Sequence, residues 1–491
     1  MILTAAERIK NNNFIAIMTE STTACFFAKV LYSLTKNSTF VISTEIAFVI
    51  GLLSILYLYR SKNRKQLTEE QKQSIIQNWT PEELIEDVPE NHPVLTNKRI
   101  VTTTTGKQIT INGHHCLNLA THNYLGLLNL PDIKESAIEA IRKYGVGSCG
   151  PRGFYGTIDV HLELEERLAK FMHMEESVVY SYGFSTAASA IGAYCKRGDL
   201  VFVDECVHFS IQKGLDASRS KISYFKHNDV ADLERLLKEQ DAIDRKNPSK
   251  ASKIRRFIIV EAIYMNTGEM CPLREIIELR KRYKLRLILD ESVSFGALGN
   301  HGRGITEHLN VNHDEVDLIC STLENAVGSI GGFCVGTTFI VEHQRLSGLG
   351  YCFSASTPPL LAQAAIAALD HFENEPEMFK ELNDKCRKLN AKLQNLTRFT
   401  FRGHELSPIK HLYLKNVDEE RTEKVEILEK IVDKCIELNL AIINASYLEQ
   451  VERYCPEPSL RVVANRLLTD EDIQFAFDTI EKVSADVLSK L

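Results

Sequence analysis

The sequence predicts an α/β protein built on a parallel or mixed sheet with helices on both faces. From about residue 130, helical patterns alternate with short β-rich runs, the clearest being Ser177–Tyr180, Leu200–Val203, Arg256–Val260 and Leu285–Leu289. These runs end in polar residues, as expected where a sheet presents its chemistry at strand carboxyl ends. The 491 residues, 44% hydrophobic and 25% charged, are enough for a large core and two lobes.

The N-terminal region predicts a membrane anchor. Residues 40–59, FVISTEIAFVIGLLSILYLY, carry Glu45 as their single charge and are long enough to cross a bilayer as a helix. A buried core helix is the alternative, but such helices rarely lack a polar stripe for this length. Four basic residues follow within 60–65, so the positive-inside rule places the rest of the chain in the cytosol. Residues 1–39 are then a lumenal or membrane-surface segment.

Composition shifts indicate the remaining boundaries. Residues 66–90 are polar and acidic, and with the basic residues before them they predict a cytosolic linker over 60–90. Within this linker, Thr80-Pro81 predicts a helix start. Alternating apolar segments near residues 100–120 predict a short hairpin. Long helical patterns dominate after residue 360. We therefore expect a large domain over 91–365 and a smaller α+β domain over 366–491.

Charge and cysteine usage exclude several classes of function. A net charge of −7 gives no reason to expect nucleic acid as a partner. The twelve cysteines are single, with no C-x-x-C pair and no metal-ligand spacing, so we expect no metal site. Residues 145–150, GVGSCG, fit the G-x-G-x-x-G pattern of dinucleotide sites. They follow a helical run rather than a strand, so a dinucleotide site is rejected.

Two long motifs resemble the α-oxoamine synthases, pyridoxal 5′-phosphate (PLP) enzymes that join an amino acid to an acyl-CoA. Residues 321–332, STLENAVGSIGG, resemble T-x-x-K-[AS]-x-G-x-x-G-G, and residues 145–165 resemble G-x-G-x-x-G-[SP]-R-x-x-x-G-x-x-x-x-H-x-x-L-E. The resemblance spans about residues 90–490 and implies the PLP-dependent transferase fold type I, with a mainly parallel seven-stranded sheet. The lysine that carries PLP is Asn325 here, and an amide nitrogen cannot form an imine.

The resemblance also implies a cofactor pocket. It places His208, in DECVHFS, against the pyridine ring, and it pairs Asp290 with the protonated ring nitrogen. From the residues alone, a solvated Asp204 and a capping His208 at a strand-to-helix turn are the alternative. The family's histidine three residues after Asp290 is Val293, which offers neither a hydrogen bond nor a proton. No catalytic residue is therefore assigned to this chain.

Two further motifs resemble ligand-binding elements of the family. Arg461, in SLRVVANRLLTDEDI, matches the arginine that holds the substrate carboxylate, although an arginine that bridges the two lobes is the alternative. FSASTPP, residues 353–359, resembles a loop that crosses the dimer interface. Ser354 and Ser356 are the candidates to contact the partner's PLP phosphate in trans.

GPRGFYG, SIQKGLDASRS and the replaced lysine together resemble a lysine-less subunit of an acyltransferase in this family. The resemblance implies a heterodimer in the endoplasmic reticulum membrane, single-pass, with a cytosolic catalytic domain. A lysine-bearing second subunit would bind PLP covalently, small membrane regulatory subunits are further partners, and this chain alone would be inactive. The alternatives are a catalytically silent, membrane-tethered regulator and an enzyme that uses another lysine. Weak PLP binding by this chain's own pocket is left open.

Overall fold

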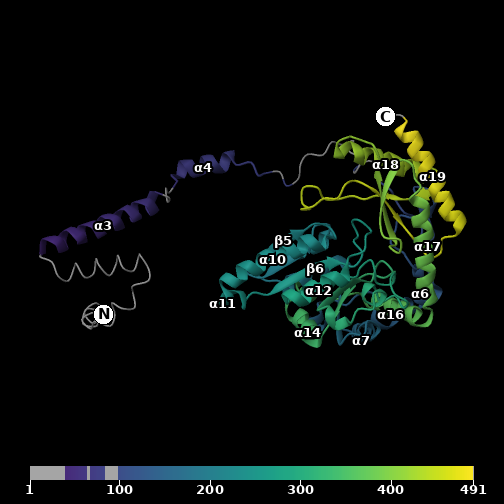
Figure 1. The fold of residues 1–491 in the computed structure, drawn as a ribbon, viewed down its shortest axis with the longest axis horizontal. Helices are drawn as coiled ribbons and strands as arrows, with labels where there is room; N and C mark the ends of the chain where they lie inside the picture. Colours follow the sequence, from purple (N-terminus) through teal and green to yellow (C-terminus); the bar gives the residue numbers. More distant parts are fainter. Residues whose placement is uncertain (1–38, 63–66, 83, 85–94, 96–97, 490–491) are drawn as a thin grey trace. The chain divides into compact units, whose positions relative to one another are not determined.

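The structure is a computed structural model of the 491-residue chain. It describes residues 39–62, 67–82, 84, 95 and 98–489 (Figure 1). The fold divides into two units, Met1–Thr96 and Asn97–Leu491, and each is described by itself.

The first unit contains two described helices, α3 (Thr39–Lys62) and α4 (Glu69–Asn78). Large apolar side chains from Phe48 to Leu58 on α3 are exposed. Among the residues that the structure describes, no helix is long and apolar enough to cross a membrane, and the span at 40–59 stays a prediction.

Helix α4 lies inside the segment expected to be a linker and begins where the sequence offers a reciprocal cap. Thr68 Oγ1 accepts from the Gln71 N–H at 3.2 Å, and Gln71 Oε1 accepts from the Thr68 N–H at 3.1 Å. The helix start predicted at Thr80 is wrong for the described residues, because 80–82 are not helical. They follow Trp79, the extended residue that ends α4.

The second unit begins with the predicted hairpin. Strands β1 (Gln108–Ile111) and β2 (His114–Asn118) pair antiparallel. The far strand β12 (Leu440–Ala441) pairs parallel with β2 and completes a three-stranded sheet. The first and last parts of this unit therefore share a sheet.

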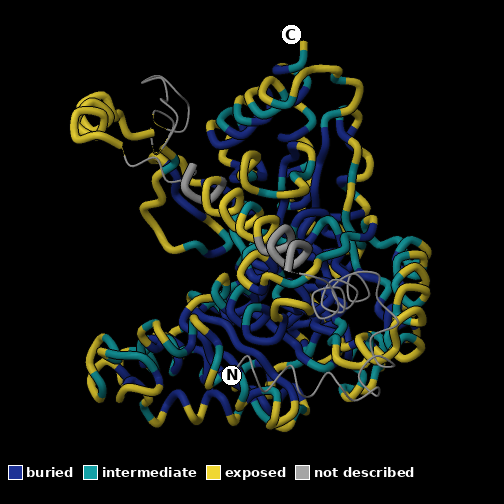
Figure 2. Tube along the Cα trace, turned by 90° about the vertical axis from the view of Figure 1, so that its left-hand side faces the viewer, coloured by how far each residue is buried: buried dark blue, intermediate teal, exposed yellow. Residues whose placement is uncertain are grey.

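A seven-stranded sheet forms the centre of the second unit, with the order β3-β9-β8-β7-β6-β4-β5. Its strands are β3 (Glu176–Tyr180), β4 (Leu200–Asp204), β5 (Lys221–Phe225), β6 (Arg256–Glu261), β7 (Arg286–Asp290), β8 (Leu318–Thr322) and β9 (Gly332–Gly336). Strand β9 is antiparallel to both of its neighbours, and the other neighbouring strands are parallel. The mainly parallel sheet is confirmed. Its strands are largely buried (Figure 2), except the edge strand β5, of which only Phe225 is buried.

Helices surround this sheet, some from the crossovers between its strands and some from the segments before β3 and after β9 (Figure 1). The longer ones are α6 (Pro131–Tyr144), α7 (Asp159–Phe171), α8 (Gly183–Tyr194), α9 (Phe209–Ser218), α10 (Val230–Lys246), α12 (Leu273–Tyr283), α14 (Thr338–Ser347) and α16 (Pro359–Asn374). The short ones are α11 (Pro248–Ala251), α13 (Ile305–His308) and α15 (Leu349–Cys352). An aromatic cluster packs between helices and sheet: Phe295 lies 5.0 Å from Phe333 and 5.7 Å from Phe372, ring centroid to centroid.

A four-stranded antiparallel sheet follows, with the order β10-β11-β14-β13. Its strands are β10 (Phe399–Arg402), β11 (Ile409–Leu414), β13 (Ile443–Asn444) and β14 (Leu460–Val463). Helices α17 (Glu377–Leu393), α18 (Arg421–Glu437) and α19 (Asp470–Leu488) lie together beside it (Figure 1). This is the α+β composition expected for the C-terminal region.

Candidate active site

Three carboxylates stand at the carboxyl ends of neighbouring strands of the central sheet. Asp204 ends β4, Glu261 ends β6 and Asp290 ends β7, and all three are buried. Glu261 and Asp290 are register partners. Burial raises the pKa of Asp290, and burial together with the Asp290 charge raises the pKa of Glu261 to about 8. This edge therefore favours a cationic ligand group, such as a protonated ring nitrogen.

Asn325 lies directly beside Asp290 in the hydrogen-bond network. Its Nδ2 donates to the Ser292 carbonyl at 2.8 Å, and the Ser292 N–H donates to Asp290 Oδ1 at 2.8 Å. Val293 is 1% exposed and belongs to the hydrophobic core. The Asp290 side of the site suits a PLP ring, but the Asn325 amide is already engaged and carries no amine. The residues present therefore do not fit covalently bound PLP.

His208 is the N-cap residue of α9, so the capping role is what the structure shows. Its ring Nδ1 accepts from the Ser210 backbone N–H at 3.3 Å, and the backbone N–H of His208 donates to Glu261 Oε1. Burial, assisted by the Arg461 charge, lowers the pKa of His208 to about 4, so the ring is neutral. The ring meets Phe184 edge to face at 6.5 Å. A stacking role against a pyridine ring stays a prediction.

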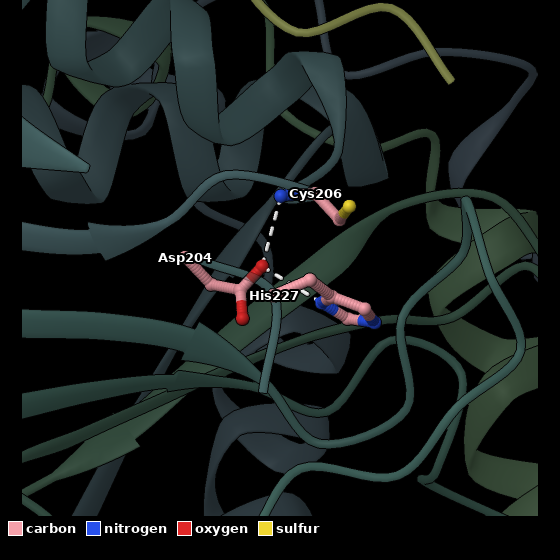
Figure 3. Close-up of side chains that lie close together, drawn as sticks. All are labelled: Asp204, Cys206 and His227. Atoms are coloured by element: carbon pink, nitrogen blue, oxygen red, sulfur yellow. Dashed lines mark hydrogen bonds and ion pairs between the residues drawn. The ribbon is translucent and has the colours of Figure 1, made fainter. Parts of the chain in front are cut away.

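Asp204 is fully buried rather than solvated, and its partner is a histidine that sequence reasoning missed. His227 Nδ1 lies 2.9 Å from Asp204 Oδ1 (Figure 3). The other ring nitrogen, Nε2, lies 2.9 Å from Glu269 Oε2 and 3.1 Å from Thr267 Oγ1. Burial opposes the charge, but the hydrogen bond to Asp204 and the other contacts outweigh it and raise the pKa of His227 to about 12. His227 is therefore a partly buried cation between two carboxylates.

The same group satisfies the distance criterion for a metal site, since ligand atoms of Asp204, Cys206 and His227 lie within 4.8 Å of one another. Both ring nitrogens of His227 are occupied by oxygen partners, and a metal ligand needs a free lone pair. Asp204 Oδ1 also accepts from the Cys206 N–H at 2.8 Å (Figure 3). We assign this cluster to an ion-pair network rather than to a metal site.

Arg461, on β14, faces a pocket of about 240 Å³ that His208 also lines. Among the described residues, the buried Nε of Arg461 has no hydrogen-bond partner, and neither has the buried Tyr447 hydroxyl in the same pocket. Burial lowers the pKa of Arg461, and that of His411 to about 4, so His411 is neutral. An unsatisfied guanidinium donor beside a hydroxyl suits a ligand carboxylate. The structure thus brings His208 and Arg461 together, while Asp290 and Asn325 are not among the pocket's lining residues.

The FSAS loop packs on the glycine-rich loop of its own chain. Ser356 is buried and its hydroxyl donates to the Gly150 carbonyl at 3.0 Å, while Ser354 donates to the Gly350 carbonyl. Contact of either serine with a partner's phosphate stays a prediction. A larger hollow of about 670 Å³ beside Arg152 includes none of the predicted cofactor residues.

Comparison with known protein families identifies the family of this fold. Residues 114–479 match the family "Aminotransferase class I and II". The chain therefore belongs to the aminotransferase class I and II family.

Curated relatives narrow the assignment. The chain is 40% identical to long chain base biosynthesis protein 1b of Oryza sativa subsp. japonica, with 87% of each chain covered. It is 38% identical to serine palmitoyltransferase 1 of Dictyostelium discoideum, with 90% of this chain and 94% of the relative covered. Within the family it belongs to this long-chain-base group, which confirms the resemblance. The serine palmitoyltransferase structure from Sphingomonas wittichii, 24% identical, covers 82% of this chain and 96% of its own with a TM-score of 0.71, and confirms the fold.

Proposed function

We propose that this chain is the lysine-less subunit of a serine palmitoyltransferase that condenses L-serine with palmitoyl-CoA. The reaction forms the bond between the serine Cα and the acyl carbon and releases CO2 and CoA, giving 3-ketodihydrosphingosine. The names of the relatives support the substrate class. The observation that carries the subunit role is that Asn325 occupies the position of the family's lysine. Its side-chain amide donates a hydrogen bond to the Ser292 carbonyl.

PLP would be held by a lysine-bearing partner subunit, where it supplies an electron sink for the serine Cα. This chain would contribute a wall of the shared site and stabilise the partner. Exposed aromatic side chains on the glycine-rich loop and on the FSAS loop support such an interface. Phe154 is 67% exposed, Phe353 is 75% exposed, and Tyr155 is fully exposed. Aromatic residues of this kind are typical anchors of protein interfaces.

The purified chain alone should show no internal-aldimine absorbance and no condensation activity, because position 325 carries no amine. Co-purified with a lysine-bearing subunit, it should produce the long-chain ketone from serine and palmitoyl-CoA. Spectra, borohydride reduction followed by peptide mapping, and product assay with each subunit alone check both points. A reducible PLP adduct on this chain would refute the lysine-less role. An inactive pair that still binds a lipid or a small membrane protein would favour the silent regulator.

We also propose attachment to the endoplasmic reticulum membrane, with the synthase-like unit in the cytosol. The exposed apolar side chains on α3 and the basic residues after residue 59 support this proposal. The acyl substrate and the long-chain product both partition into bilayers, so an anchored subunit keeps the site near them.

Glycosylation reporters test the topology. A sequon moved to about residue 10 should be glycosylated, while the natural sequon at Asn78 and a reporter appended at the C-terminus should stay unmodified. Endoglycosidase-sensitive gel shifts provide the measurement. Absence of glycan at both ends would indicate a segment that lies on the cytosolic surface instead of spanning. Glycan at the C-terminal reporter would place the synthase-like unit in the lumen and refute the topology.

A further inference from the structure

A carboxylate from a distant part of the sequence caps the N-terminus of α8. Glu324 Oε1 accepts a hydrogen bond at 3.1 Å from the N–H of Gly183, the first residue of this helix. The N-cap residue Tyr182 makes no side-chain capping bond. Glu324 is half-buried, and no salt bridge among the described residues includes it. The helix dipole is thus the electrostatic partner of this carboxylate.

The close approach depends on a glycine. A Cβ at position 183 would lie 2.4 Å from Thr322 Oγ1 and 3.0 Å from Glu324 Oε1. Any other residue would therefore displace the Thr322 and Glu324 side chains from these positions. The contact between the start of α8 and the Thr322 and Glu324 side chains therefore requires glycine at position 183.

This cap is continuous with the candidate cofactor site. Glu324 immediately precedes Asn325 in the chain. The Asn325 side chain donates a hydrogen bond to the Ser292 carbonyl, and the Ser292 N–H donates one to Asp290. The buried carboxylate of Asp290 has no cationic partner among the salt bridges of the described residues and would accept a protonated ring nitrogen. The N-terminus of α8 borders the pocket that His208 lines, because Phe184, the second residue of this helix, also lines it. An anionic group would be expected to bind at this end, because helix N-termini attract anions.

Glu324 already fills that place with a fixed negative charge. A phosphate group carries between one and two negative charges near neutral pH, and like charges in one site disfavour each other. The missing lysine removes only the covalent bond to PLP and would leave reversible binding intact. The Glu324 carboxylate, in contrast, would weaken the reversible binding of a phosphate-bearing cofactor.

We propose that Glu324 is an internal anion that excludes phosphate-bearing ring cofactors from this chain's own pocket. This inference rests on the proposed function, in which the cofactor belongs to the partner subunit. It adds a second barrier that is independent of position 325.

The test is binding of pyridoxamine 5′-phosphate and of pyridoxamine to the full-length purified chain, measured by equilibrium dialysis. Neither probe has an aldehyde, so surface lysines cannot trap them as imines. Glu324→Gln should bind pyridoxamine 5′-phosphate at least about tenfold more tightly than the wild type, with pyridoxamine binding unchanged. Glutamine keeps an oxygen that can accept from the Gly183 N–H, so the helix cap is retained.

Two control variants isolate the charge. Glu175→Gln removes a carboxylate that caps α14 in the same way, accepting from the Thr338 N–H at 2.8 Å, and should change neither affinity. Glu324→Asp keeps the charge and should behave as the wild type. Glu324→Ser repeats the comparison if melting shows that the glutamine variant does not fold.

Unchanged affinity for pyridoxamine 5′-phosphate in the neutral variants would overturn the proposal. An equal gain for pyridoxamine would also overturn it, because the pocket would then have loosened without regard to phosphate. The assay contains no partner subunit and no acyl-CoA, so its outcome is separate from the activity of the pair that tests the proposed function.

Discussion

Replacing His227 with glutamine should destabilise the protein by about 3–5 kcal/mol near pH 6.5, because fully buried Asp204 would lose its cation. The His227 side chain is 13% exposed and lies between Asp204 and Glu269, so solvent screens these contacts weakly. Glutamine can replace one hydrogen bond but not the charge. Urea unfolding of the wild type and the variant in the same detergent measures the difference.

The loss should depend on pH with a defined sign. Histidine has a pKa of about 6.5 in an unfolded chain, and the pKa of His227 in the folded protein is raised to about 12. Its contribution is therefore fully present below about pH 6.5 and declines, by at most about 1.4 kcal/mol per pH unit, as the pH rises through this window. The gap between wild type and variant should narrow from pH 6.5 to 8.5.

The control for this prediction is an exposed histidine–carboxylate pair. His301 lies 2.6 Å from Glu307, but its side chain is 53% exposed. Its replacement by glutamine should cost no more than about 1 kcal/mol. A His227 variant that behaves like this control, or whose loss does not change with pH, would contradict the assignment of His227 as a partly buried cation.

Arg152→Met should also destabilise the protein by about 3–5 kcal/mol. The guanidinium of Arg152 binds both carboxylate oxygens of Glu165, at 2.7 and 2.9 Å, and the two side chains are 4% and 5% exposed. Glu165 also accepts from the Val179 N–H of β3 at 2.9 Å. Without Arg152, the nearest remaining cation recorded for Glu165 is Arg345 at 3.6 Å.

Two comparisons make this test specific. Arg142→Met removes a pair with Glu135 whose arginine is 70% exposed, and should cost no more than about 1 kcal/mol. Changing Arg152 and Glu165 together to methionine should recover much of the loss, because no unpaired charge then remains buried. A double variant less stable than the single one would contradict this account. Thermal and urea unfolding provide the measurements.

Four of the seven strands of the central sheet, β3, β4, β6 and β7, could be predicted because each contains a β-rich run that is followed by a polar residue. The predicted run Leu285–Leu289 is β7 (Arg286–Asp290), one residue further along. The same logic placed Asp290 at the carboxyl edge. The sequence also showed that Asn325 lacks an amine, since that depends on chemistry at one position and not on neighbours.

The contacts that sequence reasoning missed all depend on strand order. Asp204 and Phe225 are register partners on β4 and β5, and this pairing brings His227, two residues later, to the Asp204 carboxylate. Glu324 reaches Gly183 only because the end of β8 lies against the start of α8. Spacing along the chain contains neither adjacency. The contact between His227 and Asp204 could have been found by a search for a histidine shortly after the strand that follows DECVHFS.

The three-stranded sheet of the second unit has a consequence for biosynthesis. Leu440 pairs with Leu117, about 320 residues earlier, and Arg99 forms ion pairs with Glu429 and Asp433 at 2.6 and 2.7 Å. During synthesis, the edge of β2 that pairs with β12 therefore stays unpaired until nearly the whole chain has left the ribosome. An open strand edge invites non-native pairing. Truncations that remove residues after about 440 should leave a chain that depends on chaperones, even though its entire central sheet is present.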